Sequence, residues 1–125
     1  MEILIDTNFI LTCVKQKVDF FSIVNEGIDE KVKWLIPFEV LEELRDLSKR
    51  KDIKGADKDA AKLSLEMVKL ISPEIVSIKN KNVDQGIADY IKGKDIVLAT
   101  LDKGLKNKVS NRVMVIKDVK RVEII

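Results

Sequence analysis

The sequence contains no histidine and only one cysteine, Cys13, among its 125 residues. The missing histidine removes the commonest general base, the usual ligand of zinc and copper sites, and both Ser-His-Asp and Cys-His catalysis. One cysteine forms no internal disulfide, and its place in an apolar helical pattern predicts a small buried side chain. Any chemistry must therefore use carboxylates, lysines, hydroxyls or a hard metal ion.

Aromatic residues and long apolar runs are also scarce. The chain has four Phe, one Trp and one Tyr, so we expect a core built mainly from Ile, Val and Leu. No apolar run is long enough to span a bilayer, and no basic region precedes the short N-terminal one. We therefore expect a cytoplasmic protein without a membrane segment, folded as a single domain over residues 1–125.

Strand and helix signals alternate along the chain. Strands are expected near residues 3–6, 34–36, 75–78, 96–100 and 113–116, with a short edge strand at 122–125. Helices are expected near residues 9–14, 18–26, 37–47, 60–71, 83–91 and 103–109. Two of the strands are continuously apolar. This order predicts an α/β fold with a parallel sheet of about five strands, covered by helices on both faces.

Acidic residues stand at or just beyond the ends of four predicted strands. Asp6 directly follows the first strand, and Glu42 and Glu43 lie about two turns into the helix after the second. Asp84 begins the helix after the third strand, and Asp102 lies just past the fourth. The carboxyl ends of parallel strands share one edge of the sheet, where open α/β folds bind ligands. We therefore expect these acids to converge in one cleft.

Carboxylates gathered in one cleft repel one another unless a countercharge is present. A divalent cation is the simplest countercharge. Mg²⁺ prefers oxygen ligands and keeps several waters, so substrate phosphate oxygens fit its open positions. Paired ions of this kind activate an attacking water and stabilise a leaving oxygen without any histidine. The pattern thus favours a metal site for phosphate-ester chemistry.

Each acid also has a simpler interpretation when taken alone. Asp6 serves equally well as a helix cap, and Asp84 and Asp102 suit a cap or a first helical turn. Glu42 and Glu43 are compatible with an ordinary solvated face. These interpretations do not explain why each boundary carries an acid near the same edge, nor Glu43, which lies too deep in its helix to cap it. Jointly, the acids favour the metal site.

Four segments in order resemble the PIN-domain ribonucleases over nearly the whole chain. The segments are residues Ile5–Asn8, Pro37–Leu44, Val83–Ala88 and Leu98–Lys103. A fifth stretch, Lys58–Leu65, is similar to the subgroup linked to small-subunit ribosomal RNA processing in archaea and eukaryotes. Toxins of toxin–antitoxin pairs share the acids but usually differ in that stretch.

The resemblance implies a three-layer α/β/α sandwich that often forms homodimers and cleaves RNA with Mg²⁺ or Mn²⁺. It implies that the catalytic and metal-binding residues are Asp6, Glu43, Asp84 and Asp102. Glu43 is preferred to Glu42 because it directly precedes Leu44 in a Val-x-x-Glu-Leu pattern. Asn8 and Thr100 match accessory polar positions that hold a carboxylate or a metal-bound water. The sequence departs from the subgroup at Gln85-Gly86, where a glycine in a first helical turn is expected to cost little.

Positive charge is clustered although the net charge is only +2. One cluster directly follows Asp102 and is the better candidate for contacting an RNA backbone: Lys103, Lys106, Lys108 and Arg112. The other lies in the loop beyond the Glu43 helix, at Lys49, Arg50, Lys51 and Lys54. The simpler interpretation of both is a solvated surface.

Several functions remain open at this point. A metal-dependent endoribonuclease would act in ribosomal RNA processing with a ribosome-assembly partner, or as a toxin whose cleft an antitoxin covers. A catalytically inactive RNA-binding PIN domain is a further alternative, which the presence of all four acids disfavours. A phosphoryl-accepting receiver domain is also disfavoured, since the first strand ends in one acid rather than two.

Overall fold

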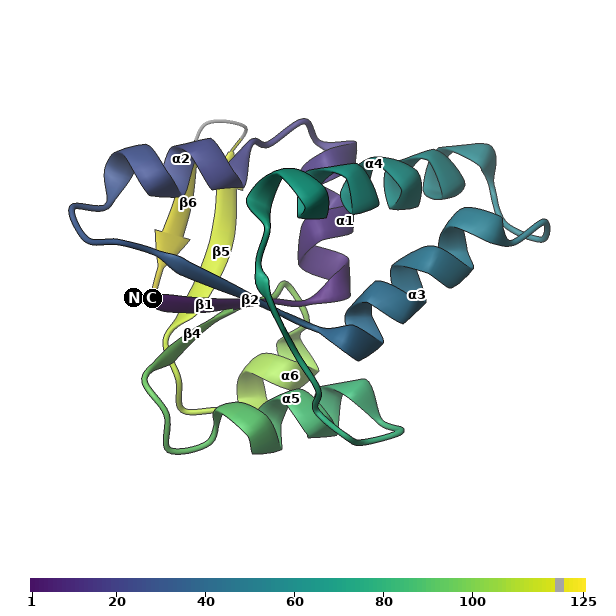
Figure 1. Cartoon of the computed structure of the whole chain (residues 1–125). Coiled ribbons are helices and arrows are strands. Elements are labelled where there is room, and N and C mark those ends of the chain that lie inside the picture. The colour runs from purple at the N-terminus through teal and green to yellow at the C-terminus, as the bar shows by residue number, and fades with distance from the viewer. Residues whose placement is uncertain (119–120) are drawn as a thin grey trace.

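A single six-stranded sheet forms the centre of the protein in the computed structural model, which describes residues 1–118 and 121–125 (Figure 1). The strands are β1 (Glu2–Ile5), β2 (Lys33–Pro37), β3 (Glu74–Val76), β4 (Ile96–Ala99), β5 (Val113–Asp118) and β6 (Arg121–Ile124). Their order is β3-β2-β1-β4-β5-β6; the first five are parallel, and β6 runs antiparallel to β5. The predicted edge strand near residues 122–125 is therefore confirmed as β6.

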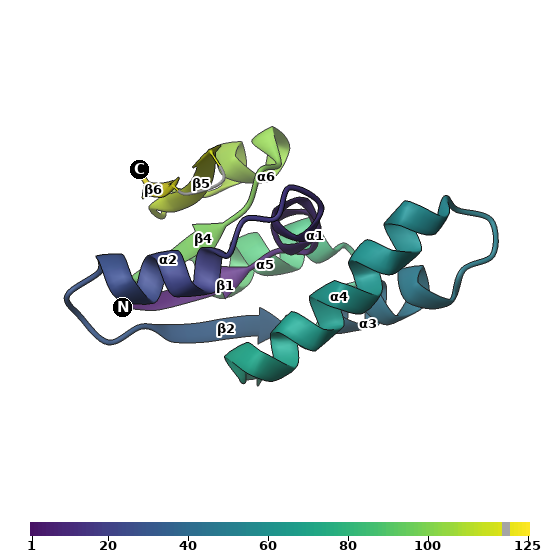
Figure 2. The same ribbon diagram turned by 90° about the horizontal axis from the view of Figure 1, so that it is seen from above.

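Helices cover both faces of the sheet. They are α1 (Thr7–Lys15), α2 (Phe20–Gly27), α3 (Phe38–Lys49), α4 (Gly55–Ile71), α5 (Val83–Ile91) and α6 (Lys103–Lys108). Because successive strand residues face opposite sides, Ile3 and Ile5 pack with α1 to α4, while Leu4 packs with α5 and α6. The α/β/α sandwich is thus confirmed. The α3–α4 pair lies side by side and projects beyond the sheet (Figures 1 and 2).

Four of the six aromatic residues, Phe9, Phe20, Phe21 and Trp34, gather in the core beside α1 and α2. Phe20 makes edge-on contacts with Phe9 and Trp34, at ring-centroid distances of 5.3 and 5.4 Å. Trp34 is only 5% exposed, so its ring packs in the core. Cys13 is fully buried, and burial raises the pKa of its thiol to about 12. It therefore behaves as the small hydrophobe that the sequence predicts.

Several predicted boundaries differ from the structure by two or more residues, and two of these differences have an evident cause. Strand β3 ends at Val76 instead of residue 78, because the Glu39 carboxylate accepts hydrogen bonds from the Ile78 amide and the Ser77 hydroxyl, both at 3.2 Å. These contacts take the backbone out of the ladder. Helix α4 begins at Gly55, five residues earlier than predicted. Asp57 in its first turn complements the helix dipole and pairs with Lys15 on α1.

Gly86 has a packing role that the argument from helix propensity did not predict. This buried residue lies where α5 approaches the loop after β3. A Cβ atom there would come within 2.8 Å of Ile78 Cδ1 and 2.9 Å of Asn80 Cβ. Glycine is thus required by the close approach of helix and loop, which fixes the start of α5 beside the sheet edge.

No helix in the described ranges is long and apolar enough to cross a membrane.

Candidate metal centre

The carboxyl edge of the sheet opens between β1 and β4, the two central strands. Strands β2 and β3 are added on one side of β1, and β4 and β5 on the other. The order in which strands are added therefore reverses between β1 and β4. Such a reversal leaves a crevice beyond the strand ends, where α/β proteins bind ligands. The Asp6 amide extends the β1–β4 pairing by donating to the Ala99 carbonyl at 3.1 Å. Residues just after both strands are thereby fixed side by side.

Asp6 is the most buried of the four predicted acids, at 5% exposed. Its Oδ1 accepts a hydrogen bond from the Thr7 amide at 2.7 Å and so caps α1, while Oδ2 accepts from the Thr100 hydroxyl at 2.8 Å. The helix-cap interpretation of Asp6 is therefore correct. It does not exclude a ligand role, since each carboxylate oxygen keeps a further lone pair.

Thr100 links the two strand ends. Besides donating to Asp6, its hydroxyl accepts a hydrogen bond from the Asp102 amide at 3.1 Å. Asp102 in turn caps α6 by accepting from the Leu105 amide at 3.0 Å. Asn8 reaches across from α1, where its Oδ1 lies 3.5 Å from the Leu101 amide, a long contact. Both predicted accessory residues thus join the segment after β1 to the segment after β4.

The two remaining acids arrive on helices. Glu43 is half-buried on α3, whereas its neighbour Glu42 is exposed. Asp84 lies in the first turn of α5, a helix capped by Asn82. All four acids line one hollow of about 310 Å³, whose other walls are formed by Thr7, Asn8, Leu11, Leu47 and Val83. Four segments distant in sequence therefore meet where the strand pattern predicts.

Electrostatics in this hollow disfavour ionised carboxylates. Burial raises the pKa of Asp6; hydrogen bonds from the Thr100 hydroxyl and the Thr7 amide oppose this, and the charges of Asp84 and Asp102 add to it. Burial also raises the pKa of Glu43, as do the charges of Asp6 and Asp84, while the Thr7 side chain lowers it. Asp6 and Glu43 therefore experience the negative charge of neighbouring acids in the hollow, a repulsion that a bound cation would relieve.

The donor set fits a hard cation in its chemistry. None of the ion pairs within residues 1–118 and 121–125 involves any of the four acids. In those same ranges, no three acidic or cysteine side chains are already arranged to hold a metal ion. Mg²⁺ typically uses one or two carboxylates and several waters, so it does not need a closed protein cage. The uncompensated oxygens and the small hollow fit this mode of binding.

The basic cluster after Asp102 is divided by the fold. Lys103 is exposed at the start of α6, beside the acids, and Lys106 is half-buried one turn further on. Lys108 lies at the far end of α6 and lines a separate polar hollow with Lys92. Arg112 precedes β5 at the opposite, amino edge of the sheet, 3.6 Å from Asp95. Only Lys103 and Lys106 are therefore placed near the acids.

The second basic cluster lies at the tip of the α3–α4 projection, away from the sheet (Figures 1 and 2). Arg50 is engaged there by Asp52 through a two-pronged ion pair, with Nε–Oδ1 and Nη2–Oδ2 distances of 2.9 and 2.6 Å. Such a pair organises the loop itself. This loop is not part of the hollow that the acids line.

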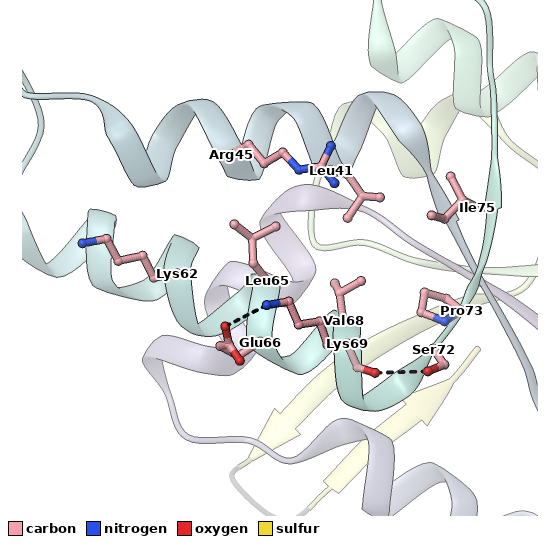
Figure 3. Close-up of a pocket in the computed structure, with 10 residues that line it drawn as sticks. All are labelled: Leu41, Arg45, Lys62, Leu65, Glu66, Val68, Lys69, Ser72, Pro73 and Ile75. Carbon is pink, nitrogen blue, oxygen red and sulfur yellow. Dashed lines mark hydrogen bonds and ion pairs between the residues drawn. The ribbon is translucent and has the colours of Figure 1, made fainter.

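A larger hollow of about 520 Å³ lies between α3, α4 and the start of β3 (Figure 3). Its floor is apolar, with Leu41, Leu65 and Val68, and its single carboxylate, Glu66, is already paired with Lys69 at 3.3 Å. Its other charged side chains, Arg45 and Lys62, are cationic and provide no oxygen ligand for a metal ion. Size alone thus does not identify the site of chemistry, and the smaller acidic hollow is the better candidate.

Sequence reasoning missed one polar member of the site. Thr7 lines the acidic hollow and is only 7% exposed, yet its hydroxyl makes no hydrogen bond of good geometry with any described residue. The position directly after Asp6 could have drawn attention to it. Helix capping does not explain Thr7, because the N-cap of α1 is Asp6.

Comparisons with known proteins agree with this geometry. A family model described as a PIN like domain matches residues 3–121. Ribonuclease VapC4 from Methanocaldococcus jannaschii is 32% identical over 123 residues, covering 95% of this chain and 92% of its own.

Solved structures share the fold at lower sequence identity. The PIN domain endonuclease Utp24 superposes with a TM-score of 0.78 at 23% identity, over 98% of this chain and 90% of its own. A chain of the VapBC2 complex from Rickettsia felis, bound to a promoter DNA fragment, gives 0.62 at 18% identity, over 90% and 98%. The sheet order, the helical layers and the extent of the sequence match lead to one conclusion: the chain belongs to the PIN-like domain family.

Proposed function

We propose that this protein is a metal-dependent endoribonuclease that binds Mg²⁺ or Mn²⁺ through Asp6, Glu43, Asp84 and Asp102. The observation that carries the proposal is the meeting of four acids from four separate segments in one hollow, none of them with a cationic partner in residues 1–118 and 121–125. The ribonuclease name of the relative that is 32% identical supports RNA as the substrate.

In this proposal each residue has a distinct task. When bound, a divalent cation would supply the positive charge that balances the acids. It would also lower the pKa of a water molecule, which makes that water a better nucleophile toward a phosphodiester. Asp6 is held by its two hydrogen bonds, so one fixed carboxylate forms the base of the site. Glu43 and Asp84 approach from α3 and α5, and Asp102 from the start of α6. Thr100 keeps Asp6 and Asp102 in register.

Lys103 and Lys106 are the basic residues best placed to contact an RNA phosphate near the acids. Neutralising phosphates with such residues would make RNA binding weaken as salt rises. For Lys108 and Arg112 a direct contact requires RNA that continues around α6 toward the amino edge of the sheet. Their role in binding RNA stays a prediction.

The cellular role within this proposal is ribosomal RNA processing in the cytoplasm, supported by the stretch Lys58–Leu65. A toxin would share the chemistry, and an antitoxin would cover the acidic hollow. Mapping RNA ends in cells with and without the protein separates the two. Ends within one ribosomal precursor support processing, whereas breaks in many RNAs that appear only when a co-expressed neighbouring protein is removed support a toxin.

The biochemical test uses the full chain with an end-labelled single-stranded RNA and Mn²⁺ or Mg²⁺. Metal-site charge stabilisation amounts to several kcal/mol, so Asp6→Asn should slow cleavage by at least about 100-fold. EDTA should stop cleavage by the parent protein, and added Mn²⁺ should restore it. Cleavage by Asp6→Asn at the parental rate would show the proposed mechanism to be wrong. RNA binding without cleavage by the parent would favour the inactive RNA-binding alternative.

A further inference from the structure

The Thr7 hydroxyl is one of two buried side-chain polar atoms without a hydrogen-bond partner among the described residues; the other is Trp34 Nε1. Such groups are rare because burial without a partner is unfavourable. Trp34 has a packing reason for its presence, since its ring contacts Phe20 and Phe21. Thr7 has no such reason, because valine has the same shape and would fill the same space.

The position of Thr7 explains why its hydroxyl is unbonded. Threonine within a helix usually donates to a carbonyl one turn earlier. Thr7 is the first residue of α1, so strand β1 lies in place of that turn. The usual backbone acceptor is therefore missing, and Thr7 is one of the residues that line the hollow.

Glu43 is the acid in the hollow that best suits this hydroxyl. Asp6 already accepts the Thr7 amide and the Thr100 hydroxyl, and Asp102 already caps α6. Glu43 lies on α3, which packs against α1, and it lines the same hollow as Thr7. Among the hydrogen bonds of good geometry between described residues, none ends on its carboxylate. The effect of the Thr7 side chain on the pKa of Glu43, which it lowers, agrees with their proximity.

We propose that Thr7 is a positioning residue whose hydroxyl donates to one oxygen of Glu43 when the acidic hollow holds its cation. The inference rests on the proposed function, because it assigns a partner to one of the proposed ligands. The other Glu43 oxygen is thereby turned toward the cation. Groups that orient metal ligands in this way typically account for about a tenfold change in metal affinity.

The test compares Thr7→Val, which keeps the shape and loses the hydroxyl, with Thr7→Ser, which keeps the hydroxyl. Mn²⁺ binding to the full chain without RNA is measured by titration calorimetry, and melting is measured in EDTA. Thr7→Val should bind Mn²⁺ about tenfold more weakly and melt at or above the parental temperature, while Thr7→Ser should bind within about threefold of the parent. Ser64→Ala, which removes a buried hydroxyl bonded to Ala60 on α4, should leave Mn²⁺ affinity unchanged.

A second comparison isolates the pair. In a Glu43→Gln background, Thr7→Val should cause no further loss of Mn²⁺ affinity, because groups that act through one another are not additive. Parental Mn²⁺ affinity in Thr7→Val, an equal loss in both backgrounds, or a fall of several degrees in melting temperature would each overturn the inference. If the parent binds no Mn²⁺, the proposed function fails with it. If the parent binds and Thr7→Val binds equally well, only the role of Thr7 fails.

Discussion

The two edges of the sheet handle polar groups in opposite ways. At the amino edge, charges are paired between residues at or before the starts of neighbouring strands: Lys33 with Glu74 at 3.1 Å, Arg112 with Asp95 at 3.6 Å, and the N-terminal amine with Glu30 at 3.2 Å. At the carboxyl edge, four acids share a hollow, and none takes part in an ion pair within residues 1–118 and 121–125. The same sheet therefore has one electrostatically closed edge and one open edge.

Hydrogen bonding repeats the contrast. At the amino edge, the Asn111 amide lies within 3.2 Å of three carbonyl oxygens, those of Ile91, Lys94 and Ile96. At the carboxyl edge, the buried Thr7 hydroxyl makes no hydrogen bond of good geometry within residues 1–118 and 121–125. Asn111, which serves the fold, is satisfied within it, whereas Thr7, which we assign to the metal site, leaves bonding capacity unused. The open edge is destabilising by itself, which makes the comparison testable.

The largest expected effect separates an acid of the open edge from one of the closed edge. Asp84→Asn should reduce RNA cleavage by at least about 100-fold, because it removes one charge of the proposed metal site. Asp95→Asn is the matched control: this side chain is 93% exposed and pairs with Arg112. It should leave the cleavage rate unchanged. Initial rates on one labelled RNA, with both proteins at the same concentration, provide the measurement.

Equal losses in Asp84→Asn and Asp95→Asn would contradict a difference between the edges. A loss in Asp95→Asn alone would indicate that RNA reaches Arg112 and that the amino edge contributes to binding. Circular dichroism of both variants excludes unfolding as the cause. A charge far from the acids and well exposed is expected to change stability by less than about 0.5 kcal/mol.

A smaller effect, on stability, is expected at the closed edge. Asn111→Ala should lower the free energy of unfolding by about 1–3 kcal/mol, because partly buried carbonyls lose their donor. Urea denaturation measures the loss. Asn107→Ala, an exposed position on α6, serves as control and should stay within about 0.5 kcal/mol of the parent. A stability of Asn111→Ala equal to that of Asn107→Ala would show that solvent replaces those bonds without cost.

Periodicity and strand-end position predicted most of the fold and the convergence of the acids. Asp6 and Asp102 come together because continuous apolar strands pair in parallel, which the sequence makes evident. The sequence did not show that Gly86 is needed, since the obstacle is Ile78, brought under α5 only by tertiary packing. Arg112 is adjacent to the basic helix in sequence, yet the turn into β5 carries it to the other edge. Sequence patterns over a few residues do not predict contacts that depend on how a turn or tertiary packing places the next segment.

The smallest expected effect concerns the pH dependence of the open edge without metal. Burial first, and then neighbouring acids, raise the pKa of Asp6, so the folded state binds this proton more tightly than the unfolded chain. Stability attributable to Asp6 is therefore lost as pH rises from the usual aspartate range through the raised pKa. Asp6→Asn keeps a capping side chain and does not titrate. In EDTA it should melt a few degrees above the parent at pH 7, and the gap should narrow as pH falls toward 4.

Added Mn²⁺ at pH 7 should also narrow the difference in melting temperature between Asp6→Asn and the parent. A cation that binds only the folded parent stabilises it and so raises its melting temperature. At a cation concentration 100 times the dissociation constant, the added stability is about 2.7 kcal/mol. Asp6→Asn should gain less, because one ligand charge is gone. Carboxylates outside the acidic hollow titrate equally in both proteins. The difference between the two melting temperatures therefore reports on the hollow alone. If the difference in melting temperature changes with neither pH nor Mn²⁺, the charges of the carboxylates at the carboxyl edge are as well balanced as those at the amino edge.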